Sequence, residues 1–215
     1  MKTPRAPAVR RVRLAPEARR AQLIEAAGRV ALELGCLPIS LQALSRAAGA
    51  SKALIYAYFS TQHDLFNAVL ARQFAQLAEA GLEGASQRPT LREAAQACAL
   101  IYFEHIAAQG PLIHLILRDQ FMAGRVDAAN RRFRDRVVLR LARLARRELK
   151  LSAKENVATL SLVTTIPEQA GALAWSGEMD RGRARELMID LVASSLRAFG
   201  EDGEPPRARY AARPR

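Results

Sequence analysis

This chain contains few of the residues on which catalysis, metal binding or cross-linking depend. Its 215 residues include two cysteines, three histidines and 6% aromatic residues. Cys36 and Cys98 lie far apart in apolar contexts, so we expect buried free thiols in a reducing cytoplasm and no disulfide. The histidines lack the spacing of metal ligands, and the chain has neither a glycine-rich phosphate loop nor a Gly-x-Ser-x-Gly turn. We therefore expect no metal, no cofactor and no enzymatic activity.

Long apolar stretches are also missing. No run of about 18 or more apolar residues is present, which argues against a transmembrane helix. Residues 1–16 are positively charged but have no apolar core behind them, so they do not resemble a secretory signal. No convincing alternation of apolar and polar residues predicts strands. We expect a cytoplasmic, helical protein without a membrane partner.

Positive charge is abundant, and it is unevenly distributed. The formal net charge is +12, and residues 1–71 hold ten Lys and Arg against four Asp and Glu, a net +6. Such a segment suits a polyanion such as DNA. Residues 126–150 hold nine basic and three acidic residues, also a net +6. For this second cluster we prefer a solvated helix face.

Two short helices joined by a tight turn are predicted between residues 40 and 59. Serine N-caps can satisfy free first-turn N–H groups, and a glycine can end the first helix in the left-handed conformation. Apolar residues recur at helical spacing on the inward side of both helices. The capping, turn and inward-facing residues are, in order, Ser40, Leu41, Leu44, Ala48, Gly49, Ser51, Ile55 and Phe59. This is the pattern of a helix-turn-helix, whose second helix can lie in a major groove.

The run from Leu23 to Leu65 resembles the DNA-binding domain of TetR-family transcriptional regulators. The resemblance rests on LIEAA at 23–27, Gly35, LSRAAGAS at 44–51, Lys52, Tyr56, Phe59 and Leu65. The chain departs from the family at Ala53-Leu54, where Gly-Thr is frequent, at Ala57, where His is frequent, and at Gln62, where Lys is frequent. The loss of that lysine removes an expected phosphate contact.

The resemblance implies an all-helical homodimer, usually a repressor. A small ligand in the C-terminal body would change the separation of the two heads and release the double-stranded DNA operator. The preferred function is therefore a transcriptional regulator. The alternative is a basic helical module that binds another polyanion or a protein partner, and a helical enzyme ranks behind both.

The outward face of the two short helices supplies the predicted DNA contacts. Lys52 and Tyr56 are expected to contact phosphate, while Gln42 and Leu54 are expected to contact base edges. A symmetric dimer would place two such helices about 34 Å apart, on an imperfectly palindromic operator. The predicted DNA-binding set is Ser40, Gln42, Ser51, Lys52, Ala53, Leu54, Tyr56 and Tyr58.

The predicted fold is all-α, with an N-terminal three-helix helix-turn-helix head followed by a C-terminal helical bundle body. The first helix is expected at 16–34, and the fourth opens with the capping pair Thr61 and Asp64 and runs to about Gly84. His63, in its first turn, is expected to face solvent. Body helices are expected at 91–108, 111–123, 127–149, 153–176 and 181–199, with Ser152, Glu155 and Asp180 as capping residues and a kink at Pro167.

The corresponding division of the chain is a disordered basic arm at 1–15, a helix-turn-helix DNA-binding head at 16–62, a helical effector-binding and dimerisation domain at 63–200 and a disordered tail at 201–215. For the arm, a role in contacting phosphates or a minor groove and a role as a solubilising tail both stay open.

A ligand pocket is predicted in the body, because its helices carry a few polar groups on otherwise apolar faces. The expected effector is a small, largely apolar molecule. Ordinary core packing is the alternative for each residue. The candidates are Tyr102, Phe103, His114, Leu117, Phe121, Thr164, Glu168 and Trp175.

The resemblance also implies that the last two long helices form the dimer interface as a four-helix bundle. Both helices carry apolar stripes, which could instead pack within one chain. The candidates are Leu160, Val163, Ala170, Leu173, Leu187, Leu191, Val192, Leu196 and Phe199.

Overall fold

The computed structural model describes residues 15–149 and 153–200. Within these ranges the regular structure is helical and no strand occurs, so the predicted all-α fold is confirmed. The elements are α1 (Pro16–Leu34), α2 (Leu41–Ala48), α3 (Lys52–Tyr58), α4 (Gln62–Glu79), α5 (Leu82–Ala85), α6 (Leu91–Gln109), α7 (Leu112–Arg118), the 3-10 helix η1 (Gln120–Met122), α8 (Ala128–Leu149), α9 (Ala153–Ser176) and α10 (Arg181–Gly200).

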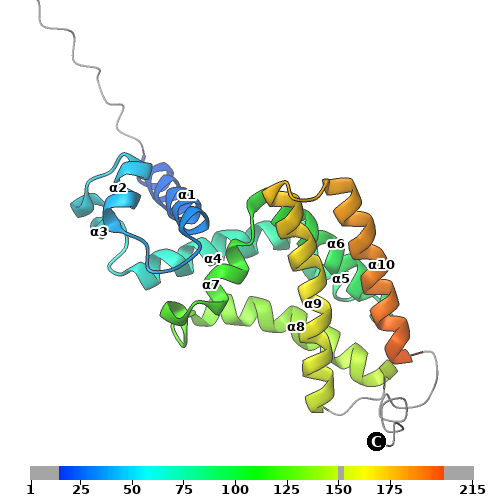
Figure 1. Ribbon diagram of the computed structural model, residues 1–215. Coiled ribbons are helices and arrows are strands. Elements are labelled where there is room, and N and C mark those ends of the chain that lie inside the picture. The colour runs from blue at the N-terminus through cyan, green and yellow to red at the C-terminus, as the bar shows by residue number, and fades with distance from the viewer. Residues whose placement is uncertain (1–14, 150–152, 201–215) are drawn as a thin grey trace, which may run out of the picture.

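The helices form a small N-terminal head and a larger body (Figure 1). The head contains α1, α2 and α3, and the long helix α4 runs from the head into the body. In the body, α9 and α10 lie side by side and pack against α6, while α8 crosses below them. The predicted head, followed by a helical bundle, is therefore present.

Local signals determine the geometry of the head. The Ser40 hydroxyl accepts hydrogen bonds from the backbone N–H groups of Gln42 and Ala43, and the Ser51 hydroxyl accepts one from Leu54. Gly49 ends α2 with a φ of 57°, which glycine adopts without steric cost. Inward-facing residues of the first four helices share one buried core, which fixes the angle between α2 and α3. They include Leu23, Ala27, Leu44, Ala48, Ile55, Phe59 and Leu65.

Two predicted helices are shorter in the structure. The Thr61–Asp64 capping box opens α4 as expected, but α4 ends at Glu79 because Gly81 adopts a φ of 87° before the single turn of α5. The helix predicted at 111–123 ends at Arg118. Asp119 there has an extended backbone, and its carboxylate accepts the N–H of Phe121 to start η1.

Two side-chain predictions in the head are wrong. His63 is half-buried, because its ring stacks on Phe121 at 4.1 Å between centroids and 7° between planes, and its Nε2 lies 3.1 Å from the Phe121 carbonyl oxygen. Cys36 is exposed because it lies in the turn after α1. Cys98 is buried as expected, and burial raises the pKa of its thiol to about 11.

Predictions for the last two helices have mixed outcomes. Asp180 caps α10 as expected, since its Oδ1 accepts the N–H of Arg183 at 3.0 Å. The chain continues through Pro167 as one helix from Ala153 to Ser176, and a kink there stays a prediction. Ser152, the proposed cap of α9, lies outside the described residues, as do residues 1–14 of the arm and the tail at 201–215.

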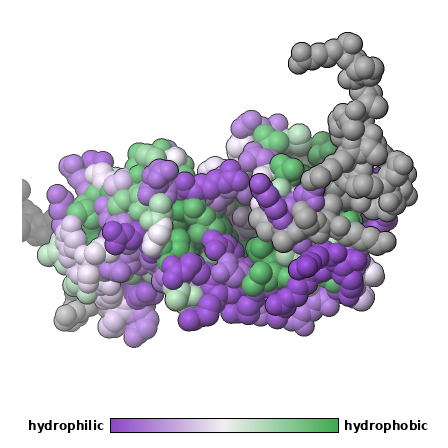
Figure 2. All heavy atoms as spheres, turned by 90° about the horizontal axis from the view of Figure 1, so that it is seen from below, coloured by the Kyte–Doolittle hydropathy of each residue, from purple (hydrophilic) through white to green (hydrophobic). Residues whose placement is uncertain are grey.

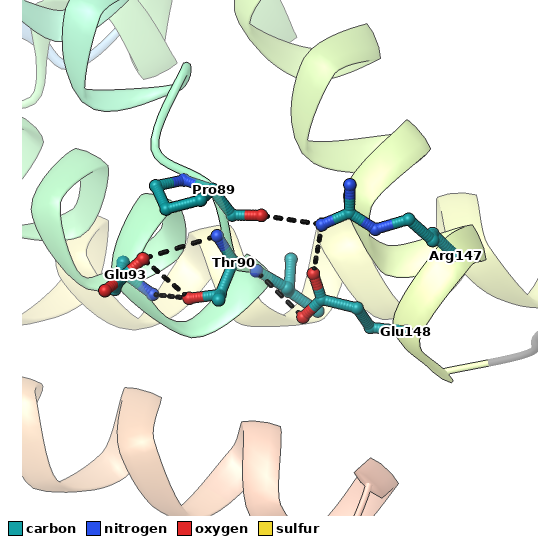
Figure 3. A network of polar contacts seen from close by, with 6 residues as sticks. Pro89, Thr90, Glu93, Arg147 and Glu148 are labelled. Atoms are coloured by element: carbon teal, nitrogen blue, oxygen red, sulfur yellow. Dashed lines mark hydrogen bonds and ion pairs between the residues drawn. The ribbon is translucent and has the colours of Figure 1, made fainter.

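The end of α8 is tied to the beginning of α6 by a polar network (Figure 3). Thr90 and Glu93 form a capping box, while the Glu148 carboxylate accepts the N–H of Leu91 at 2.9 Å. Arg147 donates to the Pro89 carbonyl at 2.6 Å. These contacts hold α6 and α8, two walls of the cavity described below, in a fixed relation at one end.

Among the described helices, no single one is long and apolar enough to cross a membrane. By length and composition alone, α6 and α7 pass the test together, with a bend of 95° between them. Seen from below the view of Figure 1, hydrophilic side chains cover much of the molecule, with hydrophobic patches between them (Figure 2).

Candidate functional site

The α2–α3 pair presents a polar face on the outside of the head. Gln42, Lys52 and Tyr56 are exposed, and Lys52 is the first residue of α3. The capping hydroxyls of Ser40 and Ser51 use an oxygen lone pair for backbone N–H groups, so each O–H can still donate to an outside acceptor. This face therefore offers a cation and several donors to a phosphate backbone.

The remaining predicted contacts differ in exposure. Ala53 is exposed, whereas Leu54 and Tyr58 are half-buried and pack partly against the core. Arg46 is exposed near the end of α2 and was not predicted. Its position outside the apolar stripe of α2 is the sequence signal that could have identified it.

Gln62 has a structural role in place of the family's lysine. Its Oε1 accepts the N–H of Ile39 at 3.1 Å, and its Nε2 donates to the Ile39 carbonyl at 2.9 Å. The side chain thus fixes the segment that leads into α2. Arg29 adds a bond from α1 to the Ala47 carbonyl at 3.3 Å, so α2 is held from both sides.

The body encloses a cavity of about 250 Å3. Six helices line it, and most of the lining side chains are apolar, as in many ligand sites. The lining residues are Phe74, Leu77, Leu82, Ala95, Cys98, Ala99, Tyr102, Ile113, Leu117, Phe133, Arg134, Val137, Val138, Leu141, Leu160, Val163, Thr164 and Glu168.

Polar side chains from α6, α7 and α9 lie at or beside one part of the cavity wall. Glu168 is buried, and its Oε1 contacts Nδ1 of His114. Burial raises the pKa of Glu168, although the positive charge of Arg118 partly offsets this. Burial, with a further effect of Arg118, lowers the pKa of His114. The pKa of Tyr102 is raised by burial and then by the charge of Glu168, so its phenol keeps its proton.

The structure brings half of the predicted ligand residues to the cavity. Tyr102, Leu117, Thr164 and Glu168 line it. His114 lies beside Glu168 and outside the wall.

The other three candidates lie elsewhere. Phe103 is fully buried in the packing of the body, and Phe121 stacks on His63 at the head. Trp175 is 44% exposed near the end of α9, next to Gly110.

Sequence reasoning missed most of the α4 and α8 wall. Phe74 and Phe133 stack at 5.0 Å between centroids, and Val137 and Leu141 continue the wall along α8. The apolar residues of α8 recur at helical spacing, which was the available signal. The many arginines of α8 instead led to the prediction of a solvated helix face.

Helix α7 and the segment after it join the cavity to the head. Ile113 and Leu117 line the cavity. Leu112 packs so closely on α1 that a Cβ added at Gly28 would lie 2.9 Å from its side chain. Asp119 Oδ2 accepts the N–H of Leu37 in the head at 2.9 Å.

A second connection runs through Asn67 on α4. Its Nδ2 donates to the Arg125 carbonyl at 2.9 Å, and its Oδ1 accepts the N–H of Asp127 at 2.9 Å. Asn130, buried on α8, donates to the Asn67 carbonyl at 2.9 Å. The segment between α7 and α8 is therefore bonded to both α1–α2 and α4.

The candidates for the dimer interface fall into two groups. Leu160 and Val163 line the cavity, and Val192 and Leu196 are buried within the chain, so these four side chains face inward because the bundle packs on them. Ala170, Leu173 and Leu187 are half-buried, and the side chain of Phe199 lies outside the description.

Large apolar side chains stay exposed on both α9 and α10. Leu191 on α10 is 54% exposed, and Leu162 on α9, which was not among the candidates, is 67% exposed. These two leucines are among the largest apolar side chains exposed in the described residues.

Residues 23–69 match a family model described as "Bacterial regulatory proteins, tetR family". This match covers α2 and α3 together with most of α1 and the beginning of α4. No curated protein matches the chain.

Solved structures share the fold over most of the chain. A TetR-like transcriptional regulator from Rhodococcus sp. RHA1 is 21% identical, with a TM-score of 0.64 over 89% of this chain and 100% of that one. A TetR family regulator from Marinobacter aquaeolei VT8 is 17% identical, with a TM-score of 0.64 over 83% and 95%. The fatty acid degradation regulator FadR from Bacillus halodurans is 13% identical, with a TM-score of 0.58 over 80% and 97%.

Proposed function

We propose that this chain, a DNA-binding transcription regulator of the TetR family, is a homodimeric repressor that releases its operator when a small, largely apolar molecule enters the body cavity. The observation that carries this proposal is the position of α7. Two of its residues, Ile113 and Leu117, line the cavity, while its neighbour Asp119 is bonded to Leu37 in the head. The short helix α7 and the residue after it thus contact both the cavity and the head.

The head, which we place at residues 16–62, would bind DNA through the exposed face of α2 and α3. Lys52 and Tyr56 contact phosphates, because both side chains are exposed on α3. Gln42 reads a base edge through its amide, and Leu54 contacts a thymine methyl with the part of its side chain that stays exposed. The net charge of +6 over residues 1–71 favours this contact electrostatically.

The effector would act by moving α7 relative to α4 and α1. A ligand that pushes Ile113 and Leu117 outward also displaces Leu112, which is in tight contact with Gly28 of α1. Release follows only if the ligand binds one head arrangement more tightly than the other. Residues 63–200 would then form the effector-binding and dimerisation domain.

The dimer would form through the outward surface of α9 and α10 that contains Leu162 and Leu191. Burying these exposed side chains against a second copy removes apolar area from water. A two-fold axis then places two α3 helices in successive major grooves, about 34 Å apart, on an imperfect palindrome.

A DNA-binding titration tests the proposal. Fluorescence anisotropy is recorded with the promoter DNA beside the protein's own gene, with a scrambled duplex of equal length and with heparin. Specific binding of the promoter supports a regulator. This binding should be weaker in Lys52→Ala and unchanged in the control Lys154→Ala, at an exposed position of α9. Equal binding of all three polyanions would instead support the basic binding module.

A further inference from the structure

The cavity wall contains one buried carboxylic acid, and its surroundings favour a ligand of opposite charge. Glu168 has a side chain that is 10% exposed, on a wall that is otherwise mostly apolar. Burying a carboxylate without a cation costs free energy that a paired cation restores. The chemistry of its neighbours therefore decides what a ligand must supply.

Basic residues near the cavity compensate the burial of Glu168 only in part. Arg134, the basic residue among the described lining residues, directs its guanidinium to Asp135, with Nη2 and Nε at 2.9 and 3.0 Å from the same carboxylate oxygen. The Arg134 side chain is also 42% exposed, so its charge is partly solvated. His114 contacts Glu168, but burial lowers its pKa and so favours the neutral imidazole. Burial raises the pKa of Glu168 by more than the positive charge of Arg118 lowers this pKa.

The groups beside Glu168 add acceptors more than donors. Thr164, one turn earlier on α9, donates its hydroxyl proton within its own helix, to the carbonyls of Leu160 and Ser161 at 2.9 and 3.1 Å. Its oxygen can therefore accept a bond from the cavity side. Tyr102, from the facing helix α6, offers a phenol oxygen that can also accept. A ligand with hydrogen-bond donors satisfies all three groups.

We propose that the effector of this cavity is an amine, with a compact apolar body and one protonated nitrogen that binds Glu168, Thr164 and Tyr102. This inference rests on the proposed function, since it names the chemical class of the molecule that acts there. An ammonium group favours the ionised carboxylate and recovers part of its desolvation cost. A carboxylate ligand would place a second negative charge beside Glu168. The volume of about 250 Å3 is below the usual range of about 300–1,000 Å3 for drug-sized ligands, so the apolar body is small.

Calorimetric titration of the full chain, without DNA, tests the inference. The probes are 3-phenylpropylamine, 3-phenylpropanol and 3-phenylpropanoate, which share one apolar body and differ in the head group. We expect the amine to bind roughly tenfold or more tightly than the other two, the order of effect expected for a buried charge pair. Glu168→Gln should remove this preference, while Glu79→Gln, at an exposed position at the end of α4, should preserve it.

Several outcomes would overturn the inference. These are tighter binding of the propanoate than of the amine, an unchanged preference in Glu168→Gln, or no binding of any probe. If Glu168→Gln does not fold, as judged by thermal melting, Glu168→Asp withdraws the carboxylate and should weaken amine binding alone. Operator release is measured separately: an amine that binds by this rule without changing DNA affinity refutes the release mechanism and leaves the ligand class standing.

Discussion

The head and the body of this protein are built in different ways. In the head, Ser40 and Ser51 cap the two short helices and Gly49 turns the chain between them, while core residues shared with α1 and α4 fix the angle between these helices. In the body, six helices from α4 to α9 contribute to the cavity. The comparison teaches that the ends of the helices that form a binding surface can be specified by sequence neighbours, whereas a cavity requires contacts between distant parts of the chain.

The largest effect is expected at the outer surface of the body. Leu191→Arg should split the proposed dimer without unfolding the chain, because Leu191 is exposed in the single subunit and would be buried in the dimer. Leu139→Arg is a matched control, since Leu139 is 52% exposed and belongs to α8, a helix that is not part of the proposed interface. Sedimentation velocity measures both. A Leu191→Arg protein that stays dimeric would refute this interface.

The junction between head and body should respond next. Asp119→Ala removes the acceptor for the Leu37 and Phe121 N–H groups, which should cost about 1–3 kcal/mol of folding free energy. Hydrogen exchange should accelerate at the Leu37 amide more than at Leu54, which Ser51 caps locally. Asp135→Ala, on α8, is the control. Uniform acceleration throughout the head would show that Asp119 supports overall stability and not this junction.

Two substitutions in the head should separate positioning from base recognition. Lys52→Ala should weaken binding to all sequences and flatten the salt dependence by about one unit per subunit. Gln42→Ala should change which bases are preferred, at about 1–3 kcal/mol for a lost base contact. Both are titrated against the operator and scrambled DNA at several salt concentrations. An altered base preference in Lys52→Ala, with an unchanged salt slope, would reverse these roles.

The smallest expected effect is an acid sensitivity of the body. Nε2 of His105 lies 2.8 Å from Oε1 of Gln73, and burial lowers the pKa of His105 from 6.5 to about 4. The unfolded chain therefore binds a proton that the folded chain excludes, and stability falls as the pH drops from 6.5 towards 4. Urea unfolding at several pH values should show a shallower decline for His105→Gln. An identical decline in both proteins would assign the sensitivity to other groups.

These differences also explain how far the sequence could predict the structure. The bounds of α1, the caps of α2 and α3 and the Thr61–Asp64 capping box follow from neighbours in sequence, and all were predicted. The bond between Asp119 and Leu37 joins residues 82 positions apart. Periodicity carries no information about such a pair, so the break after α7 and the half-buried position of His63 on Phe121 were missed.

The cavity residues, too, could be predicted from the sequence only in part. Glu168 and Tyr102 could be proposed because a polar residue on an apolar helix face is conspicuous in the sequence. Phe74 and Val137 could not be distinguished from ordinary core residues, since their role depends on the space left between α4, α6 and α8. Trp175 was proposed as part of the apolar wall, but it lies near the end of α9 in an exposed position and does not line the cavity.

The contrast between Cys36 and Cys98 makes this protein suitable for distance measurement without engineering. Cys36 is exposed in the head, whereas Cys98 is buried in the body with a thiol pKa of about 11. Near neutral pH, a thiol-specific spin label should therefore react at Cys36 and spare Cys98. In the proposed dimer each head would carry one label. Pulsed electron paramagnetic resonance would then measure the distance between the two labels, and so between the heads, with and without an effector.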